Sequence, residues 1–194
     1  MKENQEFECI NFFIGGAVKM KNKKIWLGVF ILIIIEQGIK LFINNNYLDK
    51  TFPILPPLLY FQPMFNRQYS WFNSMLGLGV GKWVHIVVVA VMLCFLYVFY
   101  KYLSSHLKKR KYLNVMFAFI FSGAICSLID KVFWNGSLDY ILVDGYFTFD
   151  LKDVYIDIFI GLMILSLILK NGVLRQVEDK IAIKEFVKFI RNKK

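Results

Sequence analysis

Four long apolar segments constrain this chain more than any other feature of its sequence. They lie at residues 25–43, 85–103, 112–133 and 154–174. A helix of about 20 residues crosses the roughly 30 Å hydrocarbon core of a bilayer, and each segment is close to that length. Hydrophobic residues make up 57% of the 194 residues, and the mean hydropathy is +0.50. This composition argues against a soluble globular domain and predicts a membrane protein with several spans.

Basic residues flank these segments unevenly. They cluster before the first segment, between the second and third, and after the fourth. The positive-inside rule therefore places both termini in the cytoplasm and leaves residues 44–84 and 134–153 on the outer side. The net charge of +10 follows these flanks and forms no single basic face. We expect anionic membrane lipids, and no nucleic acid, as the partners of this charge.

Two smaller elements complete the predicted fold. All four prolines lie within residues 53–63, where apolar residues alternate with turn formers, which predicts a small strand-and-turn element on the outer surface. In the tail, Ile183, Phe186, Val187 and Ile190 form an apolar stripe beside a basic one. This pattern predicts an amphipathic helix lying on the cytoplasmic leaflet, with a solvated tail as the alternative.

The predicted fold class is an all-α membrane protein with four transmembrane helices, a small extracytoplasmic β-like element and a C-terminal amphipathic helix. We divide the chain into a cytoplasmic N-terminal extension (1–24), a four-span membrane domain (25–174) and a basic amphipathic tail (175–194). Residues 1–19 show no pattern of a cleavable signal peptide, and Met20 is a natural beginning for the lead into the first span.

The cysteines and histidines give no sign of a disulfide or a metal site. Cys9, Cys94 and Cys126 are odd in number, and two of them lie inside apolar segments, so we expect packing residues. His85 and His106 are far apart in the sequence and have no Cys or His neighbour at ligand spacing. We therefore predict neither a metal nor an organic cofactor.

Acidic residues gather where the third segment ends and the fourth begins. The predicted topology brings Asp130, Asp139 and Asp153 to one depth near the outer interface. Three interpretations fit these acids. They can be simply solvated, they can line a cation pathway, or two of them can share a proton as in aspartic proteases, with one as general base and the other as general acid.

Five short motifs, in this order along the chain, resemble those of the bacterial lipoprotein signal peptidases, or signal peptidase II. "EQGIK" (36–40) is similar to Asp-Gln-x-x-Lys, and "NRQYSW" (66–71) weakly resembles Asn-x-Gly-Ala-Ala-Phe. "SGAICSLIDK" (122–131) is similar to Gly-Gly-Ala-x-Gly-Asn-x-x-Asp-Arg, "SLDY" (137–140) to Val-x-Asp-Phe, and "FDLKD" (149–153) to Phe-Asn-x-Ala-Asp.

The resemblance implies a four-span aspartic endopeptidase of the bacterial cell membrane. Its substrates are prolipoproteins, which are cut just before a cysteine that carries diacylglyceryl. The catalytic acids of the family fall on Asp139 and Asp153. Supporting or substrate-binding positions fall on Glu36, Lys40, Asn66, Ser127, Asp130, Lys131 and Asp150. The alternatives are a catalytically inactive four-span paralogue that binds lipidated or helical partners and, third, a small ion-conducting protein.

Several residues differ from the family motifs. Ser127 and Asp150 replace asparagines, Lys152 stands where alanine is usual, and Gln68 replaces a glycine. The extra negative charge of Asp150 should raise the pKa values of the catalytic acids, and Lys131 and Lys152 can compensate.

Three other features of the helices carry structural expectations. Glu36 and Lys40 have the i, i+4 spacing of an ion pair, for which we expect a structural role. The small residues at 122–126 predict close helix packing. Asp157 can face either the aqueous mouth or the bundle.

Overall fold

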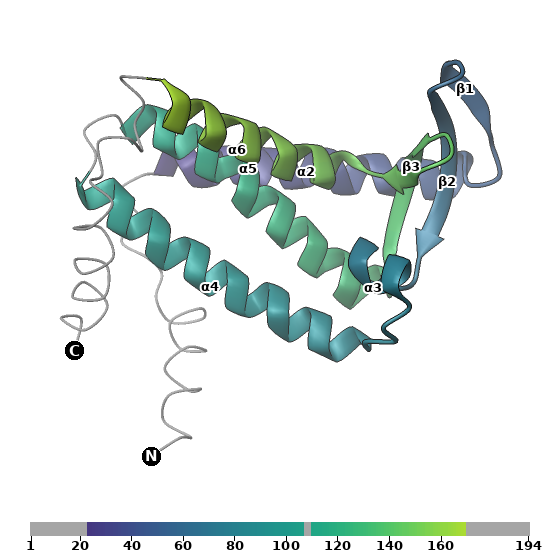
Figure 1. Ribbon diagram of the computed structural model, residues 1–194, viewed down its shortest axis with the longest axis horizontal. Coiled ribbons are helices and arrows are strands. Elements are labelled where there is room, and N and C mark those ends of the chain that lie inside the picture. The colour runs from purple at the N-terminus through teal and green to yellow at the C-terminus, as the bar shows by residue number, and fades with distance from the viewer. Residues whose placement is uncertain (1–22, 107–109, 170–194) are drawn as a thin grey trace.

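The computed structural model describes residues 23–106 and 110–169. Its long helices are α2 (Lys23–Asn46), α4 (Lys82–His106), α5 (Arg110–Ile129) and α6 (Leu151–Ile168). Helix α5 packs against each of the other three, and a π-helical turn, η1 (Asp130–Trp134), continues it toward the small sheet (Figure 1). The predicted amphipathic tail and most of the predicted N-terminal extension lie outside the described residues.

Three helices in the described part of the chain are long and apolar enough to cross a membrane. They are Ile25–Asn46, Lys82–Ser105 and Lys111–Trp134, and they match the first three predicted segments. Helix α6 begins shortly before the fourth predicted segment. Its first turns carry Lys152 and Asp153, and Asp157 follows one turn later. The fourth span therefore stays a prediction.

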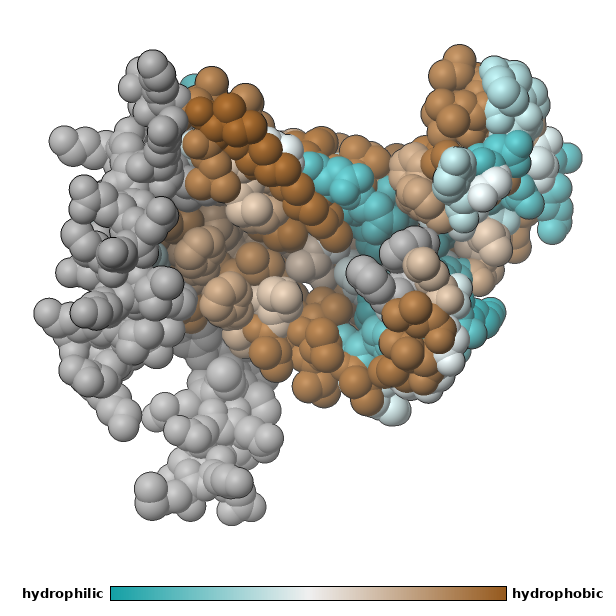
Figure 2. Space-filling view, viewed as in Figure 1, coloured by the Kyte–Doolittle hydropathy of each residue, from teal (hydrophilic) through white to brown (hydrophobic). Residues whose placement is uncertain are grey.

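Large apolar side chains cover the outer faces of the long helices. They include Leu27, Phe30, Ile31 and Ile34 on α2, Val87, Val88, Val91 and Phe95 on α4, and Ile160, Ile164, Leu165 and Ile168 on α6. In the space-filling view, hydrophobic residues cover the helical part, whereas hydrophilic residues gather toward the sheet (Figure 2). Because a helix that is apolar on all sides needs an apolar surrounding, this surface suits a lipid environment.

The described residues form one sheet of four antiparallel strands in the order β1-β2-β3-β4. Strands β1 (Phe52–Leu55) and β2 (Leu59–Asn66) confirm the predicted strand-and-turn element. The sequence interpretation missed β3 (Ser137–Val143) and β4 (Phe147–Phe149), which come from the second outer segment. Their pairing with β2 joins the two predicted outer loops into one platform, shown at the right of Figure 1.

A short helix, α3 (Trp71–Leu76), lies between the sheet and the start of α4. Ser70 caps it by accepting a hydrogen bond from the backbone N–H of Asn73, and Gly77 ends it with a positive φ of 57°. The buried side chain of Asn73 donates to the carbonyls of Gln68 and Val80 and accepts from the N–H of Val80. One amide therefore ties both ends of the α3 segment together.

Helices α5 and α6 approach closely at Gly123. A Cβ atom at this position would lie 2.8 Å from Ile156 Cγ1 and 3.0 Å from the carbonyl oxygen of Lys152. Beside it, Ser122 and Cys126 are fully buried. The close helix packing predicted for residues 122–126 is thus confirmed, and it seats the first turn of α6 against the end of α5.

Candidate active site

A buried cluster of ionisable side chains lies where α2, η1, β3 and the start of α6 meet. Helix α2 contributes Glu36 and Lys40, η1 contributes Asp130, β3 contributes Asp139, and the start of α6 contributes Asp150, Lys152 and Asp153. All are buried except the carboxylate of Asp153, whose side chain is 42% exposed. Buried charges need partners, and the cluster supplies them internally.

Lys40 is the cation on which three elements converge. Its Nζ lies 3.1 Å from Glu36 Oε1, 2.6 Å from Asp130 Oδ2 and 2.7 Å from Asp150 Oδ2. The ion pair expected between Glu36 and Lys40 is present, and it is part of a larger network. Gln37, from the same motif, also donates to Asp130 Oδ1 at 3.2 Å.

The start of α6 is fixed by a reciprocal cap. Asp150 is the N-cap residue, and its side chain accepts a hydrogen bond from the N–H of Asp153. In return, Asp153 Oδ2 accepts from the N–H of Asp150 at 3.2 Å. This capping box orients both carboxylates, because each is tied to the other's backbone. The hydroxyl of Tyr140 adds a third tie by accepting from the N–H of Leu151.

Strand β3 places Asp139 beside this helix start. The β2–β3 register sets Asp139 opposite Met64 and Ser137 opposite Asn66. Ser137 Oγ lies 2.7 Å from Asp139 Oδ1, and it lies 3.1 Å from carboxylate oxygens of both Asp130 and Asp150. A hydroxyl has one proton to donate, so the shortest of these contacts favours Asp139 as its acceptor.

Lys152 completes the cluster from within α6. Its ammonium group donates to Asp150 Oδ2 and to Ser137 Oγ, the latter at 2.7 Å. It also lies 3.6 Å from Asp139 Oδ1 and 3.9 Å from Asp153 Oδ2. The sequence interpretation gave Lys152 only a compensating charge, whereas the structure places it in contact with both predicted catalytic acids.

These neighbours shift the pKa values of the acids that precede the predicted fourth span. Burial raises the pKa of Asp139, and the charge of Asp150 raises it further against the opposing effect of Lys152. Burial also raises the pKa of Asp153, to about 7, and Asp150 and Asp139 add to this increase. Burial alone would raise the pKa of Asp150, but Lys152 and Lys40 hold it well below its ordinary value. The expected upward effect of Asp150 on both predicted catalytic acids is confirmed.

Asp139 and Asp153 line one pocket of about 460 Å³. The other predicted or neighbouring polar residues in its lining are Asn66, Ser127, Lys131 and Lys152. Lys131 Nζ donates to Ser127 Oγ at 2.7 Å, so the adjacent residues Asp130 and Lys131 have different partners. Val84, Val88 and Val89 of α4 give the pocket an apolar wall. The predicted site residues therefore form a buried ion cluster and the lining of a cavity, and Asp139 and Asp153 belong to both.

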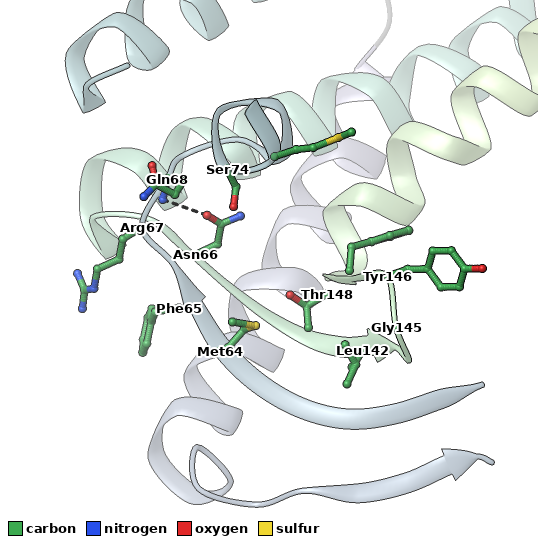
Figure 3. Close-up of a pocket in the computed structure, with 12 residues that line it drawn as sticks. Met64, Phe65, Asn66, Arg67, Gln68, Ser74, Leu142, Gly145, Tyr146 and Thr148 are labelled. Carbon is green, nitrogen blue, oxygen red and sulfur yellow. Dashed lines mark hydrogen bonds between the residues drawn. The ribbon is translucent and has the colours of Figure 1, made fainter. Parts of the chain in front are cut away.

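A second pocket, of about 820 Å³, lies between the sheet and α3 and shares Asn66 and Thr148 with the first. Figure 3 shows Met64, Leu142 and Thr148 on the strands and Ser74 on α3 around this space. Its lining is mostly apolar or uncharged. An extended segment of a ligand could therefore run from the acids along the sheet.

One oxygen from each of Asp139, Asp150 and Asp153 lies within 4.8 Å of the others. Such a trio could hold a cation. The ammonium group of Lys152 already contacts Asp150 and approaches Asp139 and Asp153. A positive charge of the protein itself therefore lies beside all three carboxylates. The arrangement suits proton transfer between acids whose pKa values differ.

Sequence reasoning missed several residues of this site. Four further residues line the pocket that contains Asp139 and Asp153, and none of them was named as a site residue: Tyr69, His85, Ser137 and Thr148. Ser137 could have been noticed, because it lies two residues before Asp139 and alternate residues of a strand share one face. The placement of Tyr69, His85 and Thr148 depends on how the sheet meets α4, which no local pattern reveals. Asp157, whose role was left open, is exposed on α6.

Comparisons with known proteins agree with this geometry. Residues 28–169 match the family model described as "Signal peptidase (SPase) II". The chain is 27% identical over 160 residues to the lipoprotein signal peptidases of Brucella ovis and Brucella canis, a match that covers 76% of this chain and 92% of each relative.

Two solved structures of bacterial membrane enzymes, obtained by the in meso method at 2.3 and 1.9 Å resolution, share the fold. They are 21% and 20% identical, with TM-scores of 0.59 and 0.61. The matches cover 74% and 75% of this chain and 86% and 93% of theirs. The resemblance drawn from the five motifs is confirmed: the chain belongs to the signal peptidase II family.

Proposed function

We propose that this protein is a membrane aspartic endopeptidase that removes signal peptides from prolipoproteins, with Asp139 and Asp153 as its catalytic pair. The observation that carries the assignment is their shared pocket, in which both carboxylates have raised pKa values beside Lys152. Two carboxylates in such surroundings do not both ionise readily, so the pair can hold one proton near neutral pH.

That protonation state is the one that peptide hydrolysis requires. The ionised carboxylate takes a proton from a water molecule, whose oxygen forms a bond to the scissile carbonyl carbon. The protonated carboxyl group gives its proton to the carbonyl oxygen. The tetrahedral intermediate, which carries two hydroxyl groups, then collapses as the C–N bond breaks. The departing nitrogen gains a proton from the pair, and one hydroxyl group returns a proton to the pair as the new carboxyl group forms. Water is consumed, and a new carboxyl and a new amino terminus result.

The surroundings of the pair suit a substrate that lies partly in lipid. The apolar wall from α4 faces the pocket, and the exposed sides of the helices are apolar, so an apolar signal helix can approach from the bilayer. The residues after the cleaved bond would follow the second pocket, along the sheet. We infer that the first of them is a cysteine carrying diacylglyceryl, whose acyl chains stay among the membrane lipids.

The proposed topology places this site at the outer surface of the cytoplasmic membrane. Both termini are cytoplasmic in this proposal, and α6 continues into a fourth span. The sheet and α3 then lie on the outer side, where exported substrates arrive. A cysteine introduced at the exposed Asp144 of a variant without native cysteines should react with a membrane-impermeant maleimide added outside intact cells. Labelling only after the cells are opened would contradict the proposed orientation.

The inactive paralogue is not favoured, because the family model and the curated relatives are peptidases and both acids of the pair are retained. An ion-conducting role has no comparable support. A direct test separates all three functions. Purified protein is mixed with a lipid-modified precursor, and the products are identified by mass spectrometry while precursor binding is measured in parallel.

Wild-type protein should release the signal peptide. Asp139→Asn and Asp153→Asn should each reduce the cleavage rate by roughly 10²–10⁴-fold, because either change removes the partnership of base and acid. Both variants should still bind the precursor, since the amide keeps the shape of the side chain. The exposed Asp144→Asn serves as the matched control and should cleave normally. Normal cleavage by either catalytic variant would refute the pair, and no product from correctly inserted wild type would refute the enzyme.

A further inference from the structure

Lys152 stands out among the residues of the site because it is a buried cation surrounded by carboxylates. Its side chain is 8% exposed, and its Nζ lies within 4 Å of Asp130, Asp139, Asp150 and Asp153. Burial alone would lower its pKa, but these four acids together raise the pKa of Lys152 well above its ordinary value. The ammonium group therefore stays charged at neutral pH.

Asp150 is the direct counter-charge of this lysine. Asp150 Oδ2 accepts from Lys152 Nζ and also lies 2.7 Å from Lys40 Nζ. The two residues are separated by Leu151 alone at the start of α6, and Asp150 caps that helix. Together they add one negative and one positive charge beside the catalytic pair, so their net contribution to the charge of the site is zero.

Each member of this pair acts on the proposed catalytic acids with the opposite sign. The ammonium of Lys152, 3.6 Å from Asp139 and 3.9 Å from Asp153, favours their ionised forms. The carboxylate of Asp150 opposes ionisation of the same two groups. Removing either charge alone must therefore move the proton affinity of the catalytic acids, and removing both must largely restore it.

We propose that Lys152 is a positioning residue of the catalytic centre, and that the Asp150–Lys152 ion pair sets the pH range in which Asp139 and Asp153 hold one proton between them. This inference rests on the proposed function of the pair. It adds a residue that acts through the catalytic acids without taking part in bond breaking.

Other charged and titratable groups face the same centre from every element packed around it. They are Glu36 and Lys40 on α2, Asp130 and Lys131 on η1, Tyr140 on β3, His85 on α4, and Tyr69 just before α3. None of them is changed in the experiment below. Their influence on the catalytic acids is therefore a common background in all variants, and differences between variants report the charges of Asp150 and Lys152.

The experiment compares four proteins: wild type, Lys152→Met, Asp150→Asn, and the double variant. Methionine keeps most of the length of lysine without its charge, and asparagine is as good an N-cap residue as aspartate. The single-turnover rate of precursor cleavage is measured across pH. The profile of Lys152→Met should move to higher pH by roughly 1–3 units, that of Asp150→Asn should move to lower pH, and the double variant should lie close to wild type.

A second measurement does not depend on catalysis. Aspartate labelled with ¹³C at its side-chain carboxyl shifts the infrared band of protonated acids, so their titration can be followed in detergent-solubilised protein. Spectra of Asp139→Asn and Asp153→Asn identify the bands of the two acids. Lys152→Met should raise their midpoints, and Asp150→Asn should lower them. Lys50→Met, which removes an exposed lysine outside the site, should leave them unchanged.

These outcomes separate the inference from the function on which it rests. If wild type cleaves no precursor, the proposed function is lost, while opposite infrared shifts would still support the charge pairing. If cleavage rates fall but neither the pH profile nor the infrared midpoints move, Lys152 has only a structural role and the inference is overturned. If Lys152→Met does not fold, Asp150→Asn and the double variant decide. The inference is supported if the pH profile of Asp150→Asn moves to lower pH and the added Lys152→Met change cancels that movement. It is overturned if the profiles of these two variants coincide.

Discussion

Lys40 Nζ lies 2.6 Å from Asp130 Oδ2 and joins α2 to η1 across 90 residues of sequence. Both side chains are almost completely buried. The contact fixes the rotation of α2 relative to α5, because neither charge can turn toward lipid without losing its partner. It also holds Asp130 where Ser137, on β3, can reach it. A single ion pair thus links the helical bundle to the strand that carries Asp139.

Replacing Lys40 with methionine should destabilise the fold strongly. The change removes the cation that Glu36, Asp130 and Asp150 share, and it leaves Lys152 as the remaining cation beside the two aspartates. Breaking a buried ion pair by removing one partner costs about 3–5 kcal/mol. Thermal unfolding in detergent, followed by circular dichroism, measures the effect. Lys50→Met, at an exposed lysine, is the control and should unfold like wild type. An unchanged midpoint for Lys40→Met would show that the network is dispensable.

Cleavage by wild type should have a bell-shaped pH dependence near neutrality. A carboxyl group with a raised pKa loses its proton as the pH rises through that value, and the pKa of Asp153 is about 7. Above that pH both acids become ionised, and no proton is available for the carbonyl oxygen. Well below it both become protonated, and no base remains for the water. Single-turnover rates from pH 4 to pH 10 measure the profile, and a rate that still rises above pH 9 would contradict the shared proton.

The close approach of α5 and α6 at Gly123 gives a prediction about helix packing. In Gly123→Ala the new Cβ would lie 2.8 Å from Ile156 and 3.0 Å from the backbone of Lys152, so α6 must move away. We expect a loss of about 1–3 kcal/mol in stability and a lower cleavage rate, because the first turn of α6 carries Asp153. Gly161→Ala, on α6 with no atom within 4 Å of the added Cβ, is the control. Equal behaviour of the two variants would rule out this packing role.

The helices and the meeting of Asp139 and Asp153 at one site could be predicted from sequence because their signals are local. An apolar run of about 20 residues indicates a span by itself, and short motifs in a fixed order point to Asp139 and Asp153 as the proposed pair. The capping box at Asp150 and Asp153 is also local, since its two members are three residues apart. In the motif, however, Asp150 stands only as a replacement for asparagine, and that comparison does not predict that it caps α6.

The remaining features depend on contacts between distant segments. Strand β3 is a short apolar run, and only its pairing with β2 shows that Ser137 and Asp139 form part of a sheet. The partners of Lys152 come from η1, β3 and the start of α6, so the spacing of residues along α6 could not reveal them all. The π-helical turn at Asp130 also changes the angular spacing of side chains, which the 3.6-residue period does not anticipate.

The last prediction concerns α3, which borders the second pocket. Asn73→Ala removes the hydrogen bonds to the carbonyls of Gln68 and Val80 and to the N–H of Val80, through which this buried side chain holds the segment. Each hydrogen bond contributes about 0.5–1.5 kcal/mol net, so the segment from residue 68 to residue 80 should open more often.

Hydrogen exchange followed by mass spectrometry should show faster exchange in that segment and unchanged exchange in α5. Because Asn73 lies outside the buried ion cluster, the KM for a lipid-modified precursor should rise severalfold while kcat changes little. Asn45→Ala, at an exposed asparagine of α2, is the control and should match wild type in both measurements. A fall in kcat with an unchanged KM would mean that α3 acts on the chemical step instead of on substrate binding, which contradicts the role inferred from its place beside the second pocket.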